Sequence, residues 1–333
     1  MSNVLLVAFS VVISTFGLAQ AGLKLPGSYS ASVFAEGLQG PTQMIVGPDE
    51  RLWLAQLAGG ENTGTGQVVA LSAETGEREV LLDNLLKPTG IAVLDGYLWI
   101  AAGRDLLRAP LTEAGVGEPE TVLRDLPFNG RSNGTLTVTP DGQLLFETSG
   151  RRSGNRAQEG SGTLQHLDPD DPANPVPIAT GLKGAYAHAF GEDGELFSTE
   201  IGDDPVNGRA PPDELNLIAE GGDYGWPRCY GNREAARNYG GTEEECEETQ
   251  APLALFAPNS TPTSVVVSPF EEDALLVALW GPAEAGVVRV SPKSGSVEPF
   301  ITGLGTPQHL LEFGGDLLVS DFGGGIVYRV TRD

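Results

Sequence analysis

Histidine, cysteine and basic side chains are scarce in this chain of 333 residues. It has three histidines and two cysteines, and its 20 lysines and arginines face 45 aspartates and glutamates, which gives a formal net charge of −25. Nucleic acids and anionic lipid surfaces are both bound by basic protein faces, so the charge argues against these partners. The acidic excess is instead typical of a well-solvated protein surface.

Long apolar runs are absent beyond the first 21 residues. Those residues carry no charge, and the apolar run over 4–18 is followed by Ala19, Gln20 and Ala21, a small-x-small cleavage pattern. This pattern predicts a signal peptide over 1–21 and a secreted or periplasmic mature chain that does not span a membrane. The alternative is an uncleaved anchor, although the run is short for a membrane span.

A unit of two short apolar strands joined by a tight turn recurs six times. The copies are TQMIVGPDERLWLAQL (42–57), TGIAVLDGYLWIAA (89–102), GTLTVTPDGQLLFETS (134–149), AYAHAFGEDGELFSTE (185–200), TSVVVSPFEEDALLVAL (263–279) and QHLLEFGGDLLVSD (308–321). The turns centre on Asp49, Asp95, Asp141, Asp193, Glu272 and Gly315, so their spacings are 46, 46, 52, 79 and 43 residues. A period of 40–50 residues with several strands per unit is typical of a β-propeller.

Each unit continues into further strands, which gives four antiparallel strands per blade. The sixth unit supplies only three strands and ends with 325–332, whereas YSASVFAEG (29–37) is a strand without a unit of its own. Pairing of 29–37 with the last blade would close the ring and remove an exposed sheet edge. The sequence therefore predicts an all-β, six-bladed propeller of four-stranded antiparallel blades. It forms a single domain over 22–333, closed by the N-terminal strand, with an insertion at about 201–258.

The two cysteines, Cys229 and Cys246, both lie in this insertion. In an exported protein, a lone pair separated by so short a loop predicts a disulfide. A zinc site is disfavoured because no histidine or further cysteine lies nearby in the sequence.

The loops that lead into the innermost strands converge at one mouth of the central channel, and loops held on a rigid scaffold are where ligands bind. The converging residues are Thr42, Gln43, Lys87, Thr89, 131–133, Lys183, Tyr186, 259–261 and 306–309.

Three segments carry a resemblance to a known family. They are PPDELNLIAEGGDYGWPRCYG (211–231), TPDGQLLFETSG (139–150) and FAPNSTPTSVVV (256–267). DELNLI followed by YGWP resembles the glucose/sorbosone dehydrogenase family, and the cysteine after YGWP is similar to its sorbosone-type branch. The resemblance covers the chain from about residue 28 to its end. It implies a secreted six-bladed propeller that oxidises the anomeric or aldehyde carbon of sugars with pyrroloquinoline quinone (PQQ), a three-carboxylate cofactor, and passes electrons to an acceptor.

The resemblance also implies a calcium ion, held by the carboxylate of Glu214 and the backbone carbonyl of Tyr224. Carboxylate and carbonyl oxygens are the ligands that Ca²⁺ prefers. Further acidic candidates in the neighbourhood are Asp203, Asp204 and Asp213. The alternative is an acidic surface loop without a metal.

Two catalytic features that the resemblance implies, a histidine base and a set of basic residues around the quinone, are missing or replaced in this sequence. The family's general base is a histidine before the innermost strand of the third blade, where this chain reads FNGRSNGTL (128–136) with Phe128, Arg131 or Ser132 in that place. An arginine always carries its proton and cannot serve as a base. The basic residues that hold the quinone's carboxylates are also replaced, by Gly184, by Thr306 and near Trp280 and Gly281. The remaining candidates for cofactor binding are Arg131, Asn133, Gln158 and Lys183, with Asn155 as a looser match.

The three histidines are His166, His188 and His309. His166 is expected to be a solvated strand residue, whereas His188 and His309 are the candidates for a substitute base near the channel. Three functions stay open at this point. They are a PQQ-dependent sugar dehydrogenase with a diverged site, a catalytically degenerate propeller that binds a carbohydrate or protein ligand, and a calcium-dependent hydrolase such as a lactonase. The last would need carboxylates that point into the channel, and the innermost strands carry few.

Overall fold

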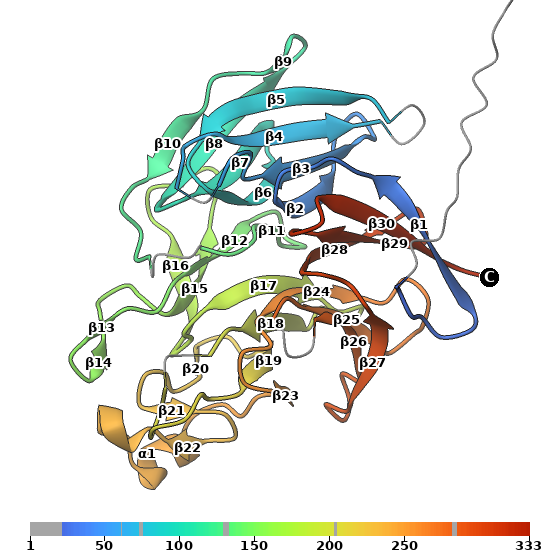
Figure 1. The fold of residues 1–333 in the computed structure, drawn as a ribbon. Helices are drawn as coiled ribbons and strands as arrows, with labels where there is room; N and C mark the ends of the chain where they lie inside the picture. Colours follow the sequence, from blue (N-terminus) through green and yellow to red (C-terminus); the bar gives the residue numbers. More distant parts are fainter. Residues whose placement is uncertain (1–21, 61, 73–75, 129–132, 203–204, 282–284) are drawn as a thin grey trace, which may run out of the picture.

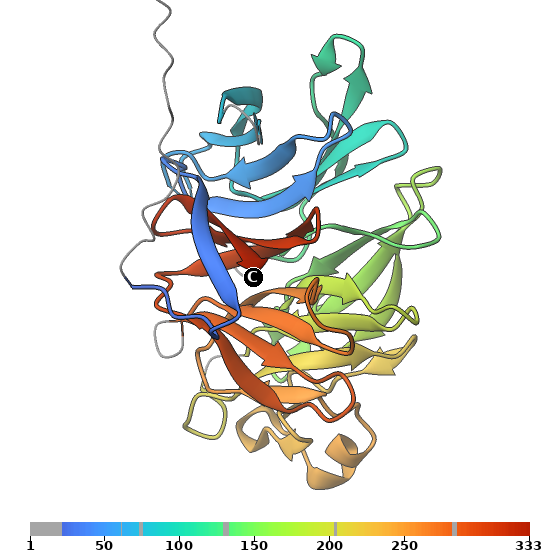
Figure 2. The same ribbon diagram turned by 90° about the vertical axis from the view of Figure 1, so that its right-hand side faces the viewer.

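The fold is a ring of small antiparallel sheets arranged around a central channel (Figures 1 and 2). The computed structural model describes residues 22–60, 62–72, 76–128, 133–202, 205–281 and 285–333. Within this part of the chain there are six blade sheets, which confirms the six-bladed propeller predicted from the repeats. The expected signal segment, Arg131, Ser132, Asp203 and Asp204 lie outside the described residues.

The first three blades follow the sequence repeats. Blade 1 contains β2 (Pro41–Val46), β3 (Leu52–Gln56), β4 (Gly66–Leu71) and β5 (Arg78–Leu85). Blade 2 contains β6 (Pro88–Leu94), β7 (Tyr97–Ala102), β8 (Asp105–Thr112) and β10 (Glu120–Leu123), and β9 (Gly115–Val116) pairs with β8. Blade 3 contains β11 (Thr137–Val138), β12 (Leu144–Thr148), β15 (Thr163–Leu167) and β16 (Val176–Thr180), to which β20 (Gly222–Asp223) adds in parallel.

The last three blades complete the ring. Blade 4 contains β17 (Ala185–Phe190), β18 (Leu196–Glu200), β19 (Asp213–Ile218) and β23 (Ala254–Phe256). Blade 5 contains β24 (Pro262–Val267), β25 (Leu275–Leu279), β26 (Gly286–Val290) and β27 (Val297–Thr302). Blade 6 contains β28 (Pro307–Phe313), β29 (Asp316–Asp321) and β30 (Ile326–Arg332), with β1 (Tyr29–Ala35) as its outermost strand.

The N-terminal strand closes the ring, as the sequence predicted. β1 pairs antiparallel with β30, from Tyr29 opposite Arg332 to Ala35 opposite Val327, and the blue strand lies beside the red ones in both views (Figures 1 and 2). Both ends of the described chain are therefore held in one sheet, which leaves neither β1 nor β30 as a free terminal strand.

The hydrophobic core is divided into clusters that lie between neighbouring blades. The strands alternate their side chains between two faces, so one strand supplies two clusters. In β12, Leu144 and Phe146 pack toward blade 2, whereas Leu145 packs with Ala185 and Leu196 of blade 4. The ring is completed by a cluster in which Met44 and Leu52 of blade 1 meet Leu318 and Val327 of blade 6.

The segment expected as an insertion over about 201–258 is partly blade. Its DELNLI motif forms β19 and residues 254–256 form β23, the third and fourth strands of blade 4. The intervening chain contains β21 (Cys229–Tyr230), β22 (Glu234–Ala235), η1 (Arg237–Tyr239) and α1 (Glu243–Glu247). Cys229 and Cys246 are disulfide-bonded with their Cα atoms 5.6 Å apart, which confirms the predicted bond.

A small hairpin, β13 (Arg152–Ser153) with β14 (Arg156–Ala157), follows the second strand of blade 3. None of the helices among the described residues has the length and apolar character that crossing a membrane requires.

Candidate functional site

A cavity at the channel mouth, named the main cavity for this central position and not for its size, lies over blades 3 to 5, at the end of the channel where the innermost strands begin. It has a volume of about 710 Å³, within the range of small-molecule sites. Its lining residues are Glu147, Gly150, Arg151, Arg152, Lys183, Gly184, Tyr186, Ile201, Gly202, Pro205, Ala210, Pro211, Asp213, Trp226, Asn259 and Thr261. A second cavity of about 400 Å³ shares Tyr186, Ile201 and Thr261 with it and continues across the channel mouth.

The antiparallel arrangement of the strands within each blade brings these residues to the same end of the channel. Lys183 precedes β17 and Thr261 precedes β24, whereas Glu147 and Ile201 stand at or just beyond the ends of the second strands β12 and β18. A second strand ends where its first strand begins, so all four positions meet at the same face. The convergence of the entering loops that the sequence predicted is therefore observed at this cavity for blades 4 and 5, and Thr42, Lys87 and Gln308 bring blades 1, 2 and 6 to the second cavity.

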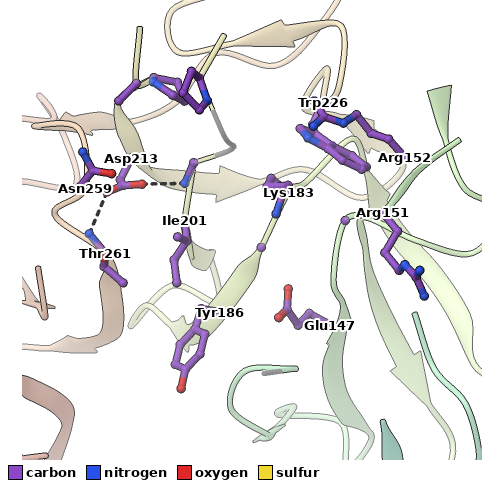
Figure 3. Close-up of a pocket in the computed structure, with 16 residues that line it drawn as sticks. Glu147, Arg151, Arg152, Lys183, Tyr186, Ile201, Asp213, Trp226, Asn259 and Thr261 are labelled. Carbon is purple, nitrogen blue, oxygen red and sulfur yellow. Dashed lines mark hydrogen bonds between the residues drawn. The ribbon is translucent and has the colours of Figure 1, made fainter. Parts of the chain in front are cut away.

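Asp213 fixes the left wall of the cavity as it is seen in Figure 3. Its carboxylate accepts hydrogen bonds from the backbone N–H of Gly202 at 2.6 Å and of Thr261 at 2.8 Å. Two backbone loops from blades 4 and 5 are thus held by one carboxylate. Asp213, which the sequence offered as a calcium candidate, serves in this structure to join these loops.

Glu147 is a buried carboxylic acid in the cavity wall, 2% exposed. Its Oε1 lies 3.4 Å from the Ser149 hydroxyl, and that hydroxyl lies 3.1 Å from Oδ1 of Asn133. Its Oε2 has no hydrogen-bond partner among the described residues. Burial raises the pKa of Glu147 to about 8, although nearby Lys183 and a backbone hydrogen bond from Ala185 act in the opposite direction.

Two further buried glutamates, Glu200 and Glu214, face each other on the paired strands β18 and β19. The amide Nδ2 of Asn216 donates to both, at 3.0 Å to Glu200 and 3.2 Å to Glu214. Burial, and for Glu200 the neighbouring charge of Glu214, raises the pKa of both carboxyl groups. The backbone N–H of Lys183 donates to Glu200 at 2.6 Å, which links this pair to the main cavity.

Comparison with known proteins identifies the family. The family model described as glucose/sorbosone dehydrogenase matches residues 100–274, more than half of the chain. The chain belongs to the glucose/sorbosone dehydrogenase family. The search of curated proteins finds no match.

Solved structures of similar proteins have the same fold. The PQQ-bound aldose sugar dehydrogenase of Streptomyces coelicolor matches with 20% identity and a TM-score of 0.71, over 92% of this chain and 100% of the other. A Trichoderma reesei protein of carbohydrate-active family AA12, described as a calcium structure, gives 17% identity and a TM-score of 0.74 over 94% and 97% of the two chains. A putative oxidoreductase (glucose dehydrogenase) of Thermus thermophilus matches with 20% identity and a TM-score of 0.72, over 91% of this chain and 100% of the other.

The residues that the glucose/sorbosone dehydrogenase resemblance implied for calcium come together in space. Glu214, Tyr224 and also Glu200 line a small cavity of about 20 Å³, which has room for one water or ion. Oε1 of Glu214 accepts from the N–H of Gly231 at 2.7 Å. Among the described residues no group of three or more His, Cys, Asp or Glu side chains is placed to hold a metal. The candidate site is therefore two carboxylates plus backbone oxygen, and Glu200 is the member that the sequence reading missed.

Of the expected cofactor residues that the structure describes, Lys183 and Asn133 lie at or near the cavity and Gln158 is not part of its lining. Lys183 lines it, and Asn133 is buried one hydrogen bond behind it through Ser149. Gln158 is exposed and follows the β13–β14 hairpin, and Arg131 lies outside the described residues. The basic residues that the sequence reading missed are Arg151 and Arg152, which directly follow blade 3's second strand. Their signal was a basic pair just beyond the TSG end of an apolar strand.

The replaced positions of the family's cofactor clamp have structural roles here. Thr306 donates its backbone N–H to Asp321 at 3.1 Å, so the loop into blade 6 is held by a carboxylate. Gly281 allows a close backbone approach, since a Cβ there would lie 1.8 Å from the carbonyl oxygen of Asn259. Lys87 is the cation among the described residues of the second cavity, and its Nζ lies 5.7 Å from the Phe128 ring centre.

The chain's histidines lie away from the main cavity. His188 and His309 line a cavity of about 640 Å³ formed where the innermost strands end, at the other mouth of the channel. Burial lowers the pKa of His188 to about 4 and that of His309 to about 3. His188 contacts the carbonyl of Ala185 through Nε2 at 2.8 Å, and Nδ1 of His309 lies 3.4 Å from the N–H of Met44. His166 is half-buried in β15.

Proposed function

We propose that the main cavity binds an anionic quinone of the PQQ type and oxidises the anomeric or aldehyde carbon of a sugar with a diverged set of residues. One observation carries the proposal. Three basic side chains, Arg151, Arg152 and Lys183, line the same 710 Å³ cavity. Charge-assisted hydrogen bonds from arginine and lysine are the strong contacts for carboxylates, and the family's quinone has three of these.

The lining residues fit such a cofactor in charge, and aromatic rings lie beside the basic side chains. The Trp226 indole lies beside Arg152 at the upper right of Figure 3, with Lys183 toward the centre of the cavity. The guanidinium of Arg152 also stacks 3.8 Å from the ring centre of Tyr239, which restricts its position. When bound, the quinone would supply the acceptor for a hydride. Lys183, Arg151 and Arg152 would hold its carboxylates.

The test is a titration of the purified protein with PQQ, followed by dye-linked oxidation of a panel of aldoses. We expect micromolar binding that weakens as salt rises, because the contacts are ionic. Lys183→Ala should weaken binding about 10-fold or more. Lys293→Ala is the matched control, since Lys293 is an exposed residue paired with Asp273 on blade 5. Absence of PQQ binding to the wild-type protein would contradict the proposal.

We also propose that Glu200, Glu214 and the carbonyl of Tyr224 bind a calcium ion. The supporting observations are a cavity large enough for one ion and two buried carboxylates that share a single amide donor. Two adjacent buried carboxylates are costly to ionise without a cation. The ion would hold the insertion against blade 4, because Tyr224 belongs to the former and both glutamates to the latter.

A second function is favoured by the positions of the histidines. None of the three lies in the main cavity, so the base that the family uses has no histidine counterpart there. A propeller that binds a carbohydrate or protein ligand without oxidising it is consistent with this arrangement. Binding of a sugar, measured by calorimetry, in a protein that binds no PQQ would support this alternative.

We propose that residues 1–21 direct secretion and are removed. The apolar run with its small-x-small ending supports this, and the Cys229–Cys246 disulfide is typical of an oxidising compartment. Expression of the full chain in a bacterial host should give an extracellular or periplasmic protein whose N-terminal residue is Gly22. Retention of residues 1–21 on the exported protein would contradict cleavage.

A further inference from the structure

Glu147 is an ionisable residue in a buried strand, where it follows three apolar residues and precedes Thr148. β12 reads LLFET, and every one of its residues is buried. Side chains alternate along a strand, so Glu147 lies on the same face as Leu145, toward blade 4, where it enters the cavity wall instead of the core. A buried carboxylate without a complete set of partners costs several kcal/mol in general, so its presence needs an explanation.

The two carboxylate oxygens of Glu147 have different surroundings. Oε1 lies 3.4 Å from the Ser149 hydroxyl, which is itself 3.1 Å from Asn133. Oε2 has no hydrogen-bond partner among the described residues. In Figure 3 the carboxylate lies between Lys183 above and Tyr186 to the left, and all three residues belong to the cavity lining. Oε1 therefore has a protein partner, whereas Oε2 is buried and unpaired at the cavity wall.

We propose that Glu147 accepts the proton of the substrate hydroxyl in this cavity, the step for which the site has no histidine. The inference rests on the proposed function. In the reaction, the O–H bond at the oxidised carbon breaks and its proton passes to Oε2 of Glu147. The C–H bond of the same carbon breaks and its hydride passes to a quinone, which is reduced, while the carbon–oxygen bond becomes a carbonyl. A pyranose would thereby give a lactone.

The surroundings suit this carboxylate to proton transfer near neutral pH. Burial raises the pKa of Glu147 to about 8, and a general base is most effective when its pKa lies near the working pH. The charged or titratable groups around it are Lys183, Glu200, Arg151, Arg152, Tyr186 and Asp213. The nearby Lys183 favours the ionised form of Glu147, the form that takes the proton.

The test compares Glu147→Gln and Glu147→Asp with the wild-type protein, all loaded with PQQ. A positioned base contributes about 10²–10⁴-fold, so Glu147→Gln should lose that factor in kcat/KM while its Kd for PQQ changes less than about 3-fold. Glu147→Asp keeps a carboxylate and should retain part of the rate. Glu298→Gln, on the exposed outer strand β27, is the matched control and should keep the wild-type rate.

A second measurement tests whether a bound sugar contacts Glu147, and it does not require turnover. In protein labelled with ¹³C at glutamate carboxyl groups, the Glu147 signal is the one that is missing from Glu147→Gln. Saturation of the quinone-free protein with an aldose should shift this signal. A bound aldose that leaves the signal unmoved would overturn the inference.

The outcomes separate this inference from the proposed function. Wild-type turnover that survives Glu147→Gln overturns the role of Glu147 alone and leaves the sugar dehydrogenase standing. A wild-type protein that binds no quinone and oxidises no aldose overturns both. A loss of kcat/KM together with a sugar-dependent shift of the Glu147 signal supports both.

Discussion

At the scale of single residues, a buried glutamate makes the stability of this protein depend on pH. The pKa of Glu147 is raised by burial to about 8 in the folded protein, against an ordinary value of 4.5. The folded state therefore binds more protons than the unfolded chain between these two values, and the free energy of unfolding falls as pH rises through that window. The stabilising contribution is complete below about pH 4.5 and lost above about pH 8.

Glu147→Gln removes this dependence because glutamine does not ionise. We expect the variant to match the wild-type protein near pH 4.5 and to be more stable at pH 9, by up to about 5 kcal/mol, because one pKa unit corresponds to about 1.4 kcal/mol. Thermal unfolding at a series of pH values measures the difference, with Glu298→Gln as the exposed control. A constant difference across the range would mean that Glu147 is ionised throughout.

Calcium should stabilise the protein through Glu214. A ligand that binds only the folded state raises the free energy of unfolding, by about 2.7 kcal/mol at 100 times its Kd. We expect calcium to raise the melting temperature and Glu214→Gln to abolish that rise. Glu200→Gln should weaken it, because Glu200 lines the same small cavity. The exposed Glu220 supplies a control, Glu220→Gln. If chelation leaves the wild-type melting temperature unchanged, there is no such site.

At the scale of elements, the disulfide holds together a segment with little regular structure of its own. Cys229 precedes β22 and Cys246 lies in α1, a five-residue helix whose first turn is capped by Thr242. Around them the buried cluster is small, with Ala235 as its further member. We expect the Cys229→Ser/Cys246→Ser double variant to be about 3 kcal/mol less stable, measured by urea unfolding. Mass spectrometry of the unreduced wild-type protein should show no free thiol.

The strands of the blades could be predicted from sequence because each carries its own local signal. Alternating apolar residues and tight turns identified β12 and β18 as second strands, and their bounds agree with the repeats. The insertion was less predictable. Its DELNLI motif was predicted to belong to the insertion, whereas it forms β19, a strand of blade 4 that contributes Glu214 to the small cavity.

The cavity residues were harder to predict because they depend on contacts between blades. Lys183 and Asn259 follow from their place in entering loops. Glu147 lies in a strand of blade 3 and reaches the cavity through the packing of that strand against blade 4, a contact that the local pattern does not encode. Arg152 reaches it because the β13–β14 hairpin leaves the blade there. His309 is the opposite case. Its place near an entering loop predicted a position at the mouth where ligands bind, whereas it lines the cavity at the other mouth.

At the scale of the whole molecule, closure of the ring depends on the N-terminal strand. Tyr29 of β1 packs edge-on against Phe270 and Phe300 of blade 5, with ring centres 5.2 Å and 5.0 Å apart. Its hydroxyl donates to Glu271 at 2.9 Å. The strand therefore completes blade 6 by backbone pairing and also joins it to blade 5 through side chains. Its removal would expose the edge of β30 to solvent and to other chains.

Deletion of residues 22–37 should lower the melting temperature sharply and promote aggregation. Because a large deletion can prevent folding outright, a point variant tests the same contact. Tyr29→Ala leaves the strand and its pairing with β30 in place but removes a buried ring, and truncation of a buried aromatic residue costs about 3–5 kcal/mol. Ser32→Ala, at an exposed position of the same strand, should change stability by less than about 0.5 kcal/mol. Urea unfolding of the three proteins measures the difference. If Tyr29→Ala and the deletion both unfold like the wild-type protein, β1 does not close the ring in solution, and the other five blades and the three strands β28–β30 suffice for stability.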